Sequence, residues 1–197
     1  FDHTKALALF PGIALAFLSL NTDSLCVHHE TCEHILEINY CRNGRIGWKL
    51  GTGHSVYLSP GDISIHKMKT CANSVISLPG GSYEGLTLFV DLHELTRNPP
   101  DLLCGTGITG ETLFDKFCTQ RPFASFSGNY DAVSIFEGFY NQPEALRSAY
   151  WKLKAIEALL YLAKLTPSDE NCLTEYRSEQ VETVRNVHQY LVDHLDQ

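Results

Sequence analysis

The stretch "YLSPGDISIH", Tyr57 to His66, decides the fold class of this chain. Its Pro60-Gly61-Asp62 tripeptide is a turn signal, because proline fixes φ at one turn position and glycine tolerates the positive φ that turns require. Apolar and polar residues alternate on both sides of the turn, which is the period of a strand with two different faces. The stretch predicts two consecutive strands, the second folded onto the first, as in a small β-barrel.

The same pattern extends from residue 12 to residue 91. Short alternating runs with turn signals between them recur about every eight to twelve residues, which indicates an antiparallel barrel or sandwich. The expected strands cover residues 34–41, 45–50, 55–58, 63–68, 74–78 and 85–91. Asn43-Gly44 is a strong hairpin signal, so we expect strand 45–50 to return alongside strand 34–41.

After Asp91 the pattern becomes helical. We expect a short helix over 111–118 lying across the barrel, a second over 129–140, a long one over 144–165, and a last one from 178 onward. The long helix has two apolar stripes. One contains Leu146, Ala149, Tyr150, Leu153, Ile156, Leu160 and Ala163, and the other contains Trp151, Ala155, Ala158, Leu162 and Leu165.

A helix that is apolar on two sides must pack against two partners. We therefore expect one side of helix 144–165 to contact the barrel and the other, with Leu146, Tyr150, Leu153 and Leu160, to contact a partner helix in a homodimer. The last helix has a heptad-like seam of its own, at Val181, Val184, His188, Leu191 and Leu195. The choice between the long helix, the last helix and a barrel edge stays open, although the two-sided helix favours the helices over the barrel edge.

Length, charge and cysteine content limit the class of protein. A chain of 197 residues fits one globular domain with a small helical appendage. The net charge is −8, with 15 Lys and Arg against 23 Asp and Glu and no basic run, so this chain is not expected to bind nucleic acid by itself. The seven cysteines are odd in number and form no CxxC pair, which favours a reduced, cytoplasmic protein.

The apolar segment from Lys5 to Leu20 resembles the start of a signal peptide. Pro11-Gly12 interrupts it, however, and no A-x-A-like cleavage site follows. It is also too short and too broken to span a bilayer. We interpret it as a buried strand that follows a Pro-Gly turn, and we expect no membrane association.

The segment "CVHHETCEH", Cys26 to His34, is the candidate metal site. It contains three His, two Cys and two Glu, which are residue types that bind zinc or iron. Only residues at i and i+2 share a strand face, so Cys26 with His28 and Cys32 with His34 have suitable spacing, whereas His28 and His29 point to opposite sides. A solvated polar loop is the interpretation we adopt, with no metal and no cofactor.

Polar and aromatic residues on the expected strands are candidate ligand-binding groups, because ligand pockets combine an apolar wall with a few convergent polar groups. We select Glu37, Asn39, Trp48, His66, Tyr83 and Glu84. Trp48 and Lys49 are neighbours, so at most one of them faces inward, and alternation does not decide which. His66 shares a face with Ser64 and Met68, where a histidine serves as a hydrogen-bonding group of a pocket or lies on the surface.

Several segments together resemble the effector-sensing half of AraC-family transcription regulators. They are "LEINYCRNGRIGWKL" followed by "YLSPGDISIH", then "GSYEGLTLFVDL", "RSAYWKLKAIEALLYL" and "YRSEQVETVRNVHQYLVDHL". The resemblance covers nearly the whole chain after about residue 30. Its strongest parts are the "YCRNG" segment, the "SPGD" turn and the "LKAIEALLYL" helix.

The resemblance implies a mainly β fold with helices, in two parts. Residues 1–128 would form a cupin-like antiparallel β-barrel with short covering helices that binds a small effector. Residues 129–197 would form a helical linker that helps the protein to form a homodimer and leads to a C-terminal pair of helix-turn-helix motifs. DNA would be bound only through those motifs, which are missing from this chain. Some relatives with similar segments sense siderophores, so a ferric chelate is a candidate ligand by analogy.

Two other functions compete with this one. A metal-dependent cupin enzyme, a dioxygenase or isomerase, would use His28 or His29 with Glu33, His34 and His66. Metal-dependent cupins carry an H-x-H with a following Glu and a later P-x-G-x-x-H, whereas here Pro60 and Gly61 are adjacent, His66 is displaced and H-x-H is absent. The Pro-Gly turn is therefore architectural, and we expect no enzyme. The third candidate is a structural domain whose barrel is filled by its own side chains.

Overall fold

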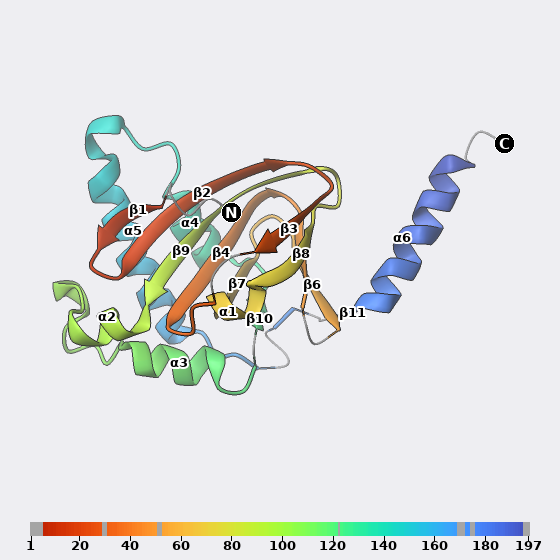
Figure 1. The fold of residues 1–197 in the computed structure, drawn as a ribbon. Coiled ribbons are helices and arrows are strands. Elements are labelled where there is room, and N and C mark those ends of the chain that lie inside the picture. The colour runs from red at the N-terminus through yellow and green to blue at the C-terminus, as the bar shows by residue number, and fades with distance from the viewer. Residues whose placement is uncertain are drawn as a thin grey trace.

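Two facing antiparallel sheets make up the fold, and most of the helices lie on the side of the first sheet (Figure 1). The computed structural model describes residues 6–28, 31–50, 53–121, 123–168, 172–173 and 176–194. The architecture confirms the expected fold class, a mainly β antiparallel fold followed by helices.

The first sheet has six strands and the second has five. In spatial order the first consists of β1 (Leu7–Phe10), β2 (Ile13–Asn21), β9 (Ser82–Asp91), β4 (Ile35–Gly44), β7 (Ile63–Lys67) and β10 (Phe123–Phe126). The second consists of β11 (Tyr176–Arg177), β6 (His54–Leu58), β5 (Ile46–Lys49), β8 (Asn73–Ser77) and β3 (Ser24–His28). The six strands expected between residues 34 and 91 are all present, and β2 follows the Pro11-Gly12 turn as expected.

The described residues form the helices α1 (Met68–Cys71), α2 (Leu92–Arg97), α3 (Gly110–Cys118), α4 (Tyr130–Glu137), α5 (Arg147–Lys164) and α6 (Ser178–Asp193), with 3-10 turns at Asp101–Leu103 and Glu144–Leu146. Side chains of α2, α3, α4 and α5 pack on the outer face of the first sheet. The expected helices correspond to α3, α4, α5 and α6. Thr109 and Asn129 cap the first turns of α3 and α4, which fixes where these two helices begin.

The hairpin predicted at Asn43-Gly44 is wrong. β4 pairs with β7 and β9, whereas β5 pairs with β6 and β8, so the chain crosses from the first sheet to the second after Gly44. Asn43 and Gly44 stay in register with β9 beyond a β-bulge, and a Cβ at Gly44 would meet the carbonyl oxygen of Ser82 at 2.1 Å. Glycine is therefore required for close approach at a barrel corner rather than for a two-residue hairpin.

The Pro60-Gly61-Asp62 turn is present, but it also connects the two sheets and does not fold β7 onto β6. Gly61 N–H donates to the carbonyl oxygen of Cys41 at 2.8 Å, which holds the turn against β4. The buried Asp62 carboxylate accepts from Ser59 N–H at 2.8 Å and from Gly128 N–H at 3.0 Å. The turn is a structural corner of the barrel.

The first sheet separates two apolar cores. Along β4, Leu36, Ile38 and Tyr40 face the helices and belong to the larger core, which includes side chains of α3, α4 and α5. The alternate residues of β4 face the second sheet, where a smaller core surrounds Trp48 and Ile76. Because the larger core lies outside the barrel, polar residues can occupy the inner face without emptying the main core.

The long helix α5 is two-sided, as expected. Ala155, Ile156, Ala158, Leu159 and Leu162 are buried against the first sheet. Leu146, Tyr150, Leu153 and Leu160 are 39 to 57% exposed on the other side. Ile156, which was assigned to the same stripe, is 4% exposed because it lies at the edge of the stripe that turns toward the barrel.

The last helix, α6, projects from the rest of the fold (Figure 1). Val184 and Leu191 of its seam are exposed, and Leu195 lies outside the described residues. Lys49 of β5 donates to Glu182 of α6 at 2.6 Å, which ties the base of this helix to the second sheet. Within the described ranges, no helix has the length and apolar character needed to cross a bilayer.

Candidate ligand cavity between the two sheets

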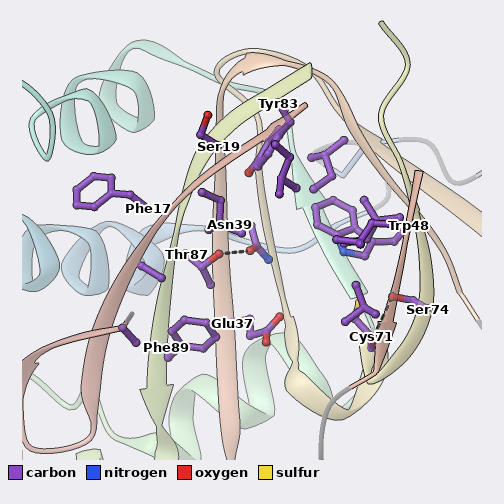
Figure 2. Close-up of a pocket in the computed structure, with 18 residues that line it drawn as sticks. Phe17, Ser19, Glu37, Asn39, Trp48, Cys71, Ser74, Tyr83, Thr87 and Phe89 are labelled. Carbon is purple, nitrogen blue, oxygen red and sulfur yellow. Dashed lines mark hydrogen bonds between the residues drawn. The ribbon is translucent and has the colours of Figure 1, made fainter. Parts of the chain in front are cut away.

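A cavity of about 250 Å³ lies between the two sheets (Figure 2). Its walls are mostly apolar and include Leu18, Leu20, Leu25, Ile46 and Ile76. β2 and β3 are consecutive in the chain, but β2 pairs with β9 and β3 pairs with β8. The half-buried Leu18, Leu20 and Leu25 mark the side of the cavity at which these two strands diverge.

Polar residues at the cavity lie on three adjacent strands of the first sheet, β7, β4 and β9. In β4, Glu37 is paired with His66 of β7 on one side and with Phe89 of β9 on the other. Two residues further along β4, Asn39 is paired in the same way with Ser64 and Thr87. Cross-strand partners point to the same face of a sheet, and so do residues two apart on one strand. Glu37, Asn39 and their cross-strand partners therefore all lie on the inner face of the first sheet.

Glu37 is a buried carboxyl, with 9% of the residue exposed. Burial penalises the charged form and raises the pKa of this carboxyl from 4.5 to about 7. Its Oε2 lies 3.2 Å from Nε2 of His66, a residue that is fully buried. The His66 ring stacks on Phe123 at a centroid distance of 4.5 Å. The carboxyl and the imidazole therefore form a buried pair at the cavity wall.

Asn39 is the centre of a hydrogen-bonded group. Thr87 Oγ1 donates to Asn39 Oδ1 at 2.7 Å, and Asn39 Nδ2 donates to Ser64 Oγ at 3.3 Å. All three residues are buried. The two bonds fix the orientation of the Asn39 amide, which is already in place before any ligand enters.

Two further hydroxyl groups of the cavity wall are bonded to the backbone. Ser74 Oγ donates to the carbonyl oxygen of Cys71 at 2.9 Å, and Tyr83 Oη donates to the carbonyl oxygen of Tyr40 at 3.2 Å. Burial raises the pKa values of the Tyr83 phenol and the Cys71 thiol, so both stay neutral. A Cβ at Gly85 would meet Tyr83 Oη at 2.2 Å, and glycine at this position leaves room for the phenol.

Four of the six residues selected from the sequence line this cavity. They are Glu37, Asn39, Trp48 and Tyr83. His66 lies behind Glu37 and is not part of the cavity wall, although its ring edge approaches Trp48 at a centroid distance of 6.1 Å. Glu84 lies elsewhere. The neighbours Trp48 and Lys49 do face opposite ways, with Trp48 buried and Lys49 exposed.

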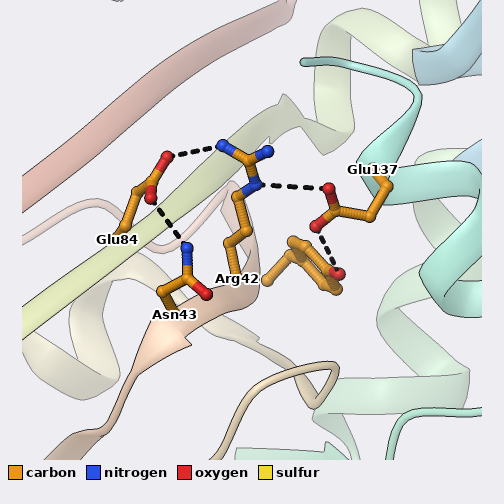
Figure 3. A network of polar contacts seen from close by, with 5 residues as sticks. Arg42, Asn43, Glu84 and Glu137 are labelled. Carbon is orange, nitrogen blue, oxygen red and sulfur yellow. Dashed lines mark hydrogen bonds and ion pairs between the residues drawn. The ribbon is translucent and has the colours of Figure 1, made fainter. Parts of the chain in front are cut away.

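Glu84 belongs to a polar network at the rim of the barrel (Figure 3). Arg42 Nη1 donates to Glu84 Oε1 at 2.7 Å, and Arg42 Nε donates to Glu137 Oε2 of α4 at 3.2 Å. Asn43 also donates to Glu84, at 2.9 Å, and this bond together with Arg42 lowers the pKa of the Glu84 carboxyl. The Arg42 guanidinium lies 4.0 Å from the centre of the Tyr140 ring. The network connects β4 and β9 to the helices.

Fourteen of the 18 lining residues were not selected from the sequence, and four of these bear on the chemistry of the wall. Thr87 and Phe89 have the same parity as Tyr83 along β9, so strict alternation from Tyr83 would have found them. Ser74 and Cys71 had no such signal, because the short helix α1 that places Cys71 was not expected.

The residues between Cys26 and His34 do not face this cavity as a group. His28 Nδ1 lies 3.2 Å from Asn73 Oδ1, and Cys32 Sγ lies 3.4 Å from His34 Nε2. His34 Nε2 is 3.7 Å from an oxygen of Asp91. His29 lies outside the described residues. Among the residues whose positions are described, no three His, Cys, Asp or Glu side chains gather closely enough to hold a metal ion.

Comparison with known proteins gives similarity only among solved structures. No family model and no curated protein matches the sequence. Wild-type ToxT from Vibrio cholerae strain SCE256, in a crystal structure with an unsaturated fatty acid, is 9% identical with a TM-score of 0.49, over 80% of this chain and 58% of that one. ToxT from Vibrio cholerae O395, bound to (E)-4-(8-methylnaphthalen-1-yl)but-3-enoic acid, is 6% identical with a TM-score of 0.45, over 81% of this chain and 61% of that one.

A third solved structure is similar to a smaller share of the chain. It is an uncharacterized protein with a double-stranded β-helix domain from Klebsiella pneumoniae, 12% identical with a TM-score of 0.35, over 44% of this chain and 73% of that one. The present chain thus spans about three fifths of the length of the two ToxT chains. At these identities and TM-scores, none of the three structures indicates what this chain binds.

Proposed function

We propose that the chain is the ligand-sensing and dimerisation part of an AraC-type transcription regulator. The observation that carries the proposal is the cavity between the sheets, with Glu37 and Asn39 held in fixed positions on its wall. A concave, mostly apolar space with a few oriented polar groups is the usual form of a small-molecule site. The sequence segments that resemble AraC-family regulators support the choice of family.

A change of structure on effector binding would be transmitted to the helices by β2. Ala16, Phe17 and Leu18 of β2 all line the cavity, but the ring of Phe17 points away from its centre (Figure 2). The Phe17 ring lies 5.4 Å from Trp151 of α5 and 5.1 Å from Tyr140, between ring centroids. A ligand that favours one position of β2 would therefore favour one position of α5, which is a population shift driven by different affinity for two states.

The dimer would use the exposed side of α5. Leu146, Leu153 and Leu160 are spaced seven residues apart, and Tyr150 lies on the same side. Four large apolar side chains on one helix face are a surface that a second copy can cover, with knobs-into-holes packing of two such helices. This stripe is our choice over the seam of α6.

The whole regulator would have further parts. In this proposal, residues 1–128 sense the effector, residues 129–197 link and dimerise, and a C-terminal pair of helix-turn-helix motifs binds DNA in the cytoplasm. The net charge of −8 agrees with a chain that leaves phosphate contacts to another segment.

Native mass spectrometry with elemental analysis tests the proposal. The expected result is a metal-free dimer whose cavity binds a small organic molecule, either carried through purification or added from a metabolite library. The matched variant Ala16→Phe, which places a ring in the cavity, should lose the bound molecule and remain dimeric. A monomer with one tightly held iron, zinc or manganese ion per chain would contradict the proposal and favour a metal-dependent enzyme.

A further inference from the structure

The cavity wall carries one charge, and three of its hydroxyl groups can accept a hydrogen bond from a ligand but have no hydrogen left to donate. Among the described residues that line it, Glu37 is the one that can be charged near neutral pH, and no lysine, arginine or histidine is present. An anionic group placed in this cavity would face the Glu37 carboxylate with no cation on the wall to balance it.

The hydroxyl groups of the wall strengthen this preference. Ser74 and Tyr83 each donate their single hydroxyl hydrogen to a backbone carbonyl oxygen, which can only accept. Thr87 donates its hydroxyl hydrogen to Asn39 Oδ1. All three oxygens keep lone pairs and have no hydrogen left to give. A ligand that supplies N–H donors therefore matches these groups better than a ligand that supplies acceptors.

The aromatic residues of the wall suit the same kind of ligand. Trp48 comes from the second sheet, and Glu37 and Phe89 lie side by side on the first (Figure 2). An indole face attracts a cation electrostatically, and it also packs against a flat or apolar body. A carboxylate and an aromatic wall on facing sheets are the two halves of a site for an organic cation.

We propose that this cavity selects a small organic ammonium ion, with an apolar or aromatic body that fits about 250 Å³. The inference rests on the proposed function, because it assumes that the cavity is the effector site. The ammonium group would donate to the Glu37 carboxylate and to the free lone pairs of Thr87, and the body would lie against Trp48 and Phe89.

Two titratable groups face Glu37 and bear on this pairing. His66 from β7 lies 3.2 Å away, and the Cys71 thiol from α1 keeps its proton because burial raises its pKa. A proton on the Glu37 carboxyl competes with the ligand ammonium for the same oxygen atoms. Ammonium binding should therefore weaken as the pH falls below about 7, the pKa of Glu37.

The test uses three probes that share one aromatic body: 2-phenylethylammonium, 2-phenylethanol and 3-phenylpropanoate. Their affinities for the full 197-residue chain are measured by isothermal titration calorimetry at pH 8, where primary ammonium groups keep their proton. We expect the ammonium ion to bind about tenfold to 100-fold more tightly than the alcohol, the range of one charge-assisted hydrogen bond, and the carboxylate to bind most weakly.

Two variants and one change of pH identify the cause. Glu37→Gln should reduce ammonium affinity to that of the alcohol, whereas Glu84→Gln, which removes the same charge at the rim, should leave the ratio of the two affinities unchanged. In the unmodified chain the ratio of ammonium affinity to alcohol affinity should be lower at pH 5.5 than at pH 8. This measurement does not depend on whether a variant folds.

Equal binding of the ammonium and carboxylate probes, an unchanged ratio in Glu37→Gln, or no ammonium binding would overturn the inference. If the alcohol or the carboxylate binds instead, and Ala16→Phe abolishes that binding, the proposed function stands and only the ligand class is wrong. If no probe and no metabolite binds, both are wrong.

Discussion

Replacement of Glu37 by glutamine should change how the stability of the protein depends on pH. In the folded chain the pKa of this carboxyl is about 7, against 4.5 when it is exposed. Between these two values the unfolded chain releases the proton and the folded chain keeps it. The free energy of unfolding therefore falls as the pH rises from 4.5 to 7 and levels off above 7.

The size of this effect follows from the same two values. At about 1.4 kcal/mol per pH unit, the difference between them corresponds to about 3 kcal/mol. Glu37 is 9% exposed, so screening by solvent reduces this value little. Glutamine has nearly the same shape and does not titrate, so Glu37→Gln should match the original chain near pH 4.5 and exceed its stability by about 3 kcal/mol at pH 8.

Urea unfolding at both pH values, followed by circular dichroism, measures this difference. All other groups titrate in both proteins, so the change of the difference with pH isolates Glu37. Glu84→Gln is the control, because the pKa of Glu84 is lowered rather than raised. This carboxylate stabilises the folded chain above pH 4.5, so Glu84→Gln should not become more stable than the original chain at pH 8. Parallel stability curves for Glu37→Gln and the original chain would refute the conclusion that burial holds a proton on Glu37.

Three other substitutions test the dimer face, a close contact and the corner turn. Leu153→Glu should shift the sedimentation profile from dimer toward monomer, because Leu153 is 57% exposed on the proposed dimer face. The control Lys152→Glu should leave the profile unchanged. If both variants sediment as dimers, the choice of this stripe is wrong. Gly85→Ala should lower the thermal midpoint by the equivalent of about 2 kcal/mol, because the new Cβ would lie 2.3 Å from the carbonyl oxygen of Tyr40. An unchanged midpoint would show that the strands can move apart at this position without loss of stability. Asp62→Ala should cost about 2 kcal/mol in urea unfolding because two backbone N–H groups lose their acceptor, and a loss below about 0.5 kcal/mol would mean that water replaces it.

The sequence was informative wherever the two-residue period of a strand is unbroken. Alternation places Glu37 and Asn39 on one face of β4 and Leu36 and Ile38 on the other, as the structure has them. Alternation does not say which face is the inside of the barrel. That depends on where the helices pack, and the packing of α4 and α5 is a long-range property that no local pattern contains.

The strand connections were the part that local signals misjudged. Asn-Gly and Pro-Gly-Asp both predicted a turn within one sheet, and at both places the chain passes to the other sheet. A turn signal reports backbone conformation at two or three residues, whereas strand pairing depends on register over a whole strand. β10, with the sequence Phe-Ala-Ser-Phe, was missed because its pairing with β7 joins segments almost 60 residues apart, as in Phe123 with His66.

The position of the main core explains how one barrel can serve as a sensor without losing its fold. On β4, β7 and β9 the residues that face the helices are almost all aliphatic, and they bury the larger apolar area. The residues of the opposite face need only satisfy one another, as Asn39, Ser64 and Thr87 do. Because adjacent strand residues belong to different cores, a substitution on the inner face changes what the cavity offers a ligand and leaves the helix-side packing in place. The same alternation gives β2 its two contacts, with the ligand cavity through Leu18 and with α5 through Phe17, so the strand that a ligand touches is also the strand that supports the proposed dimer helix.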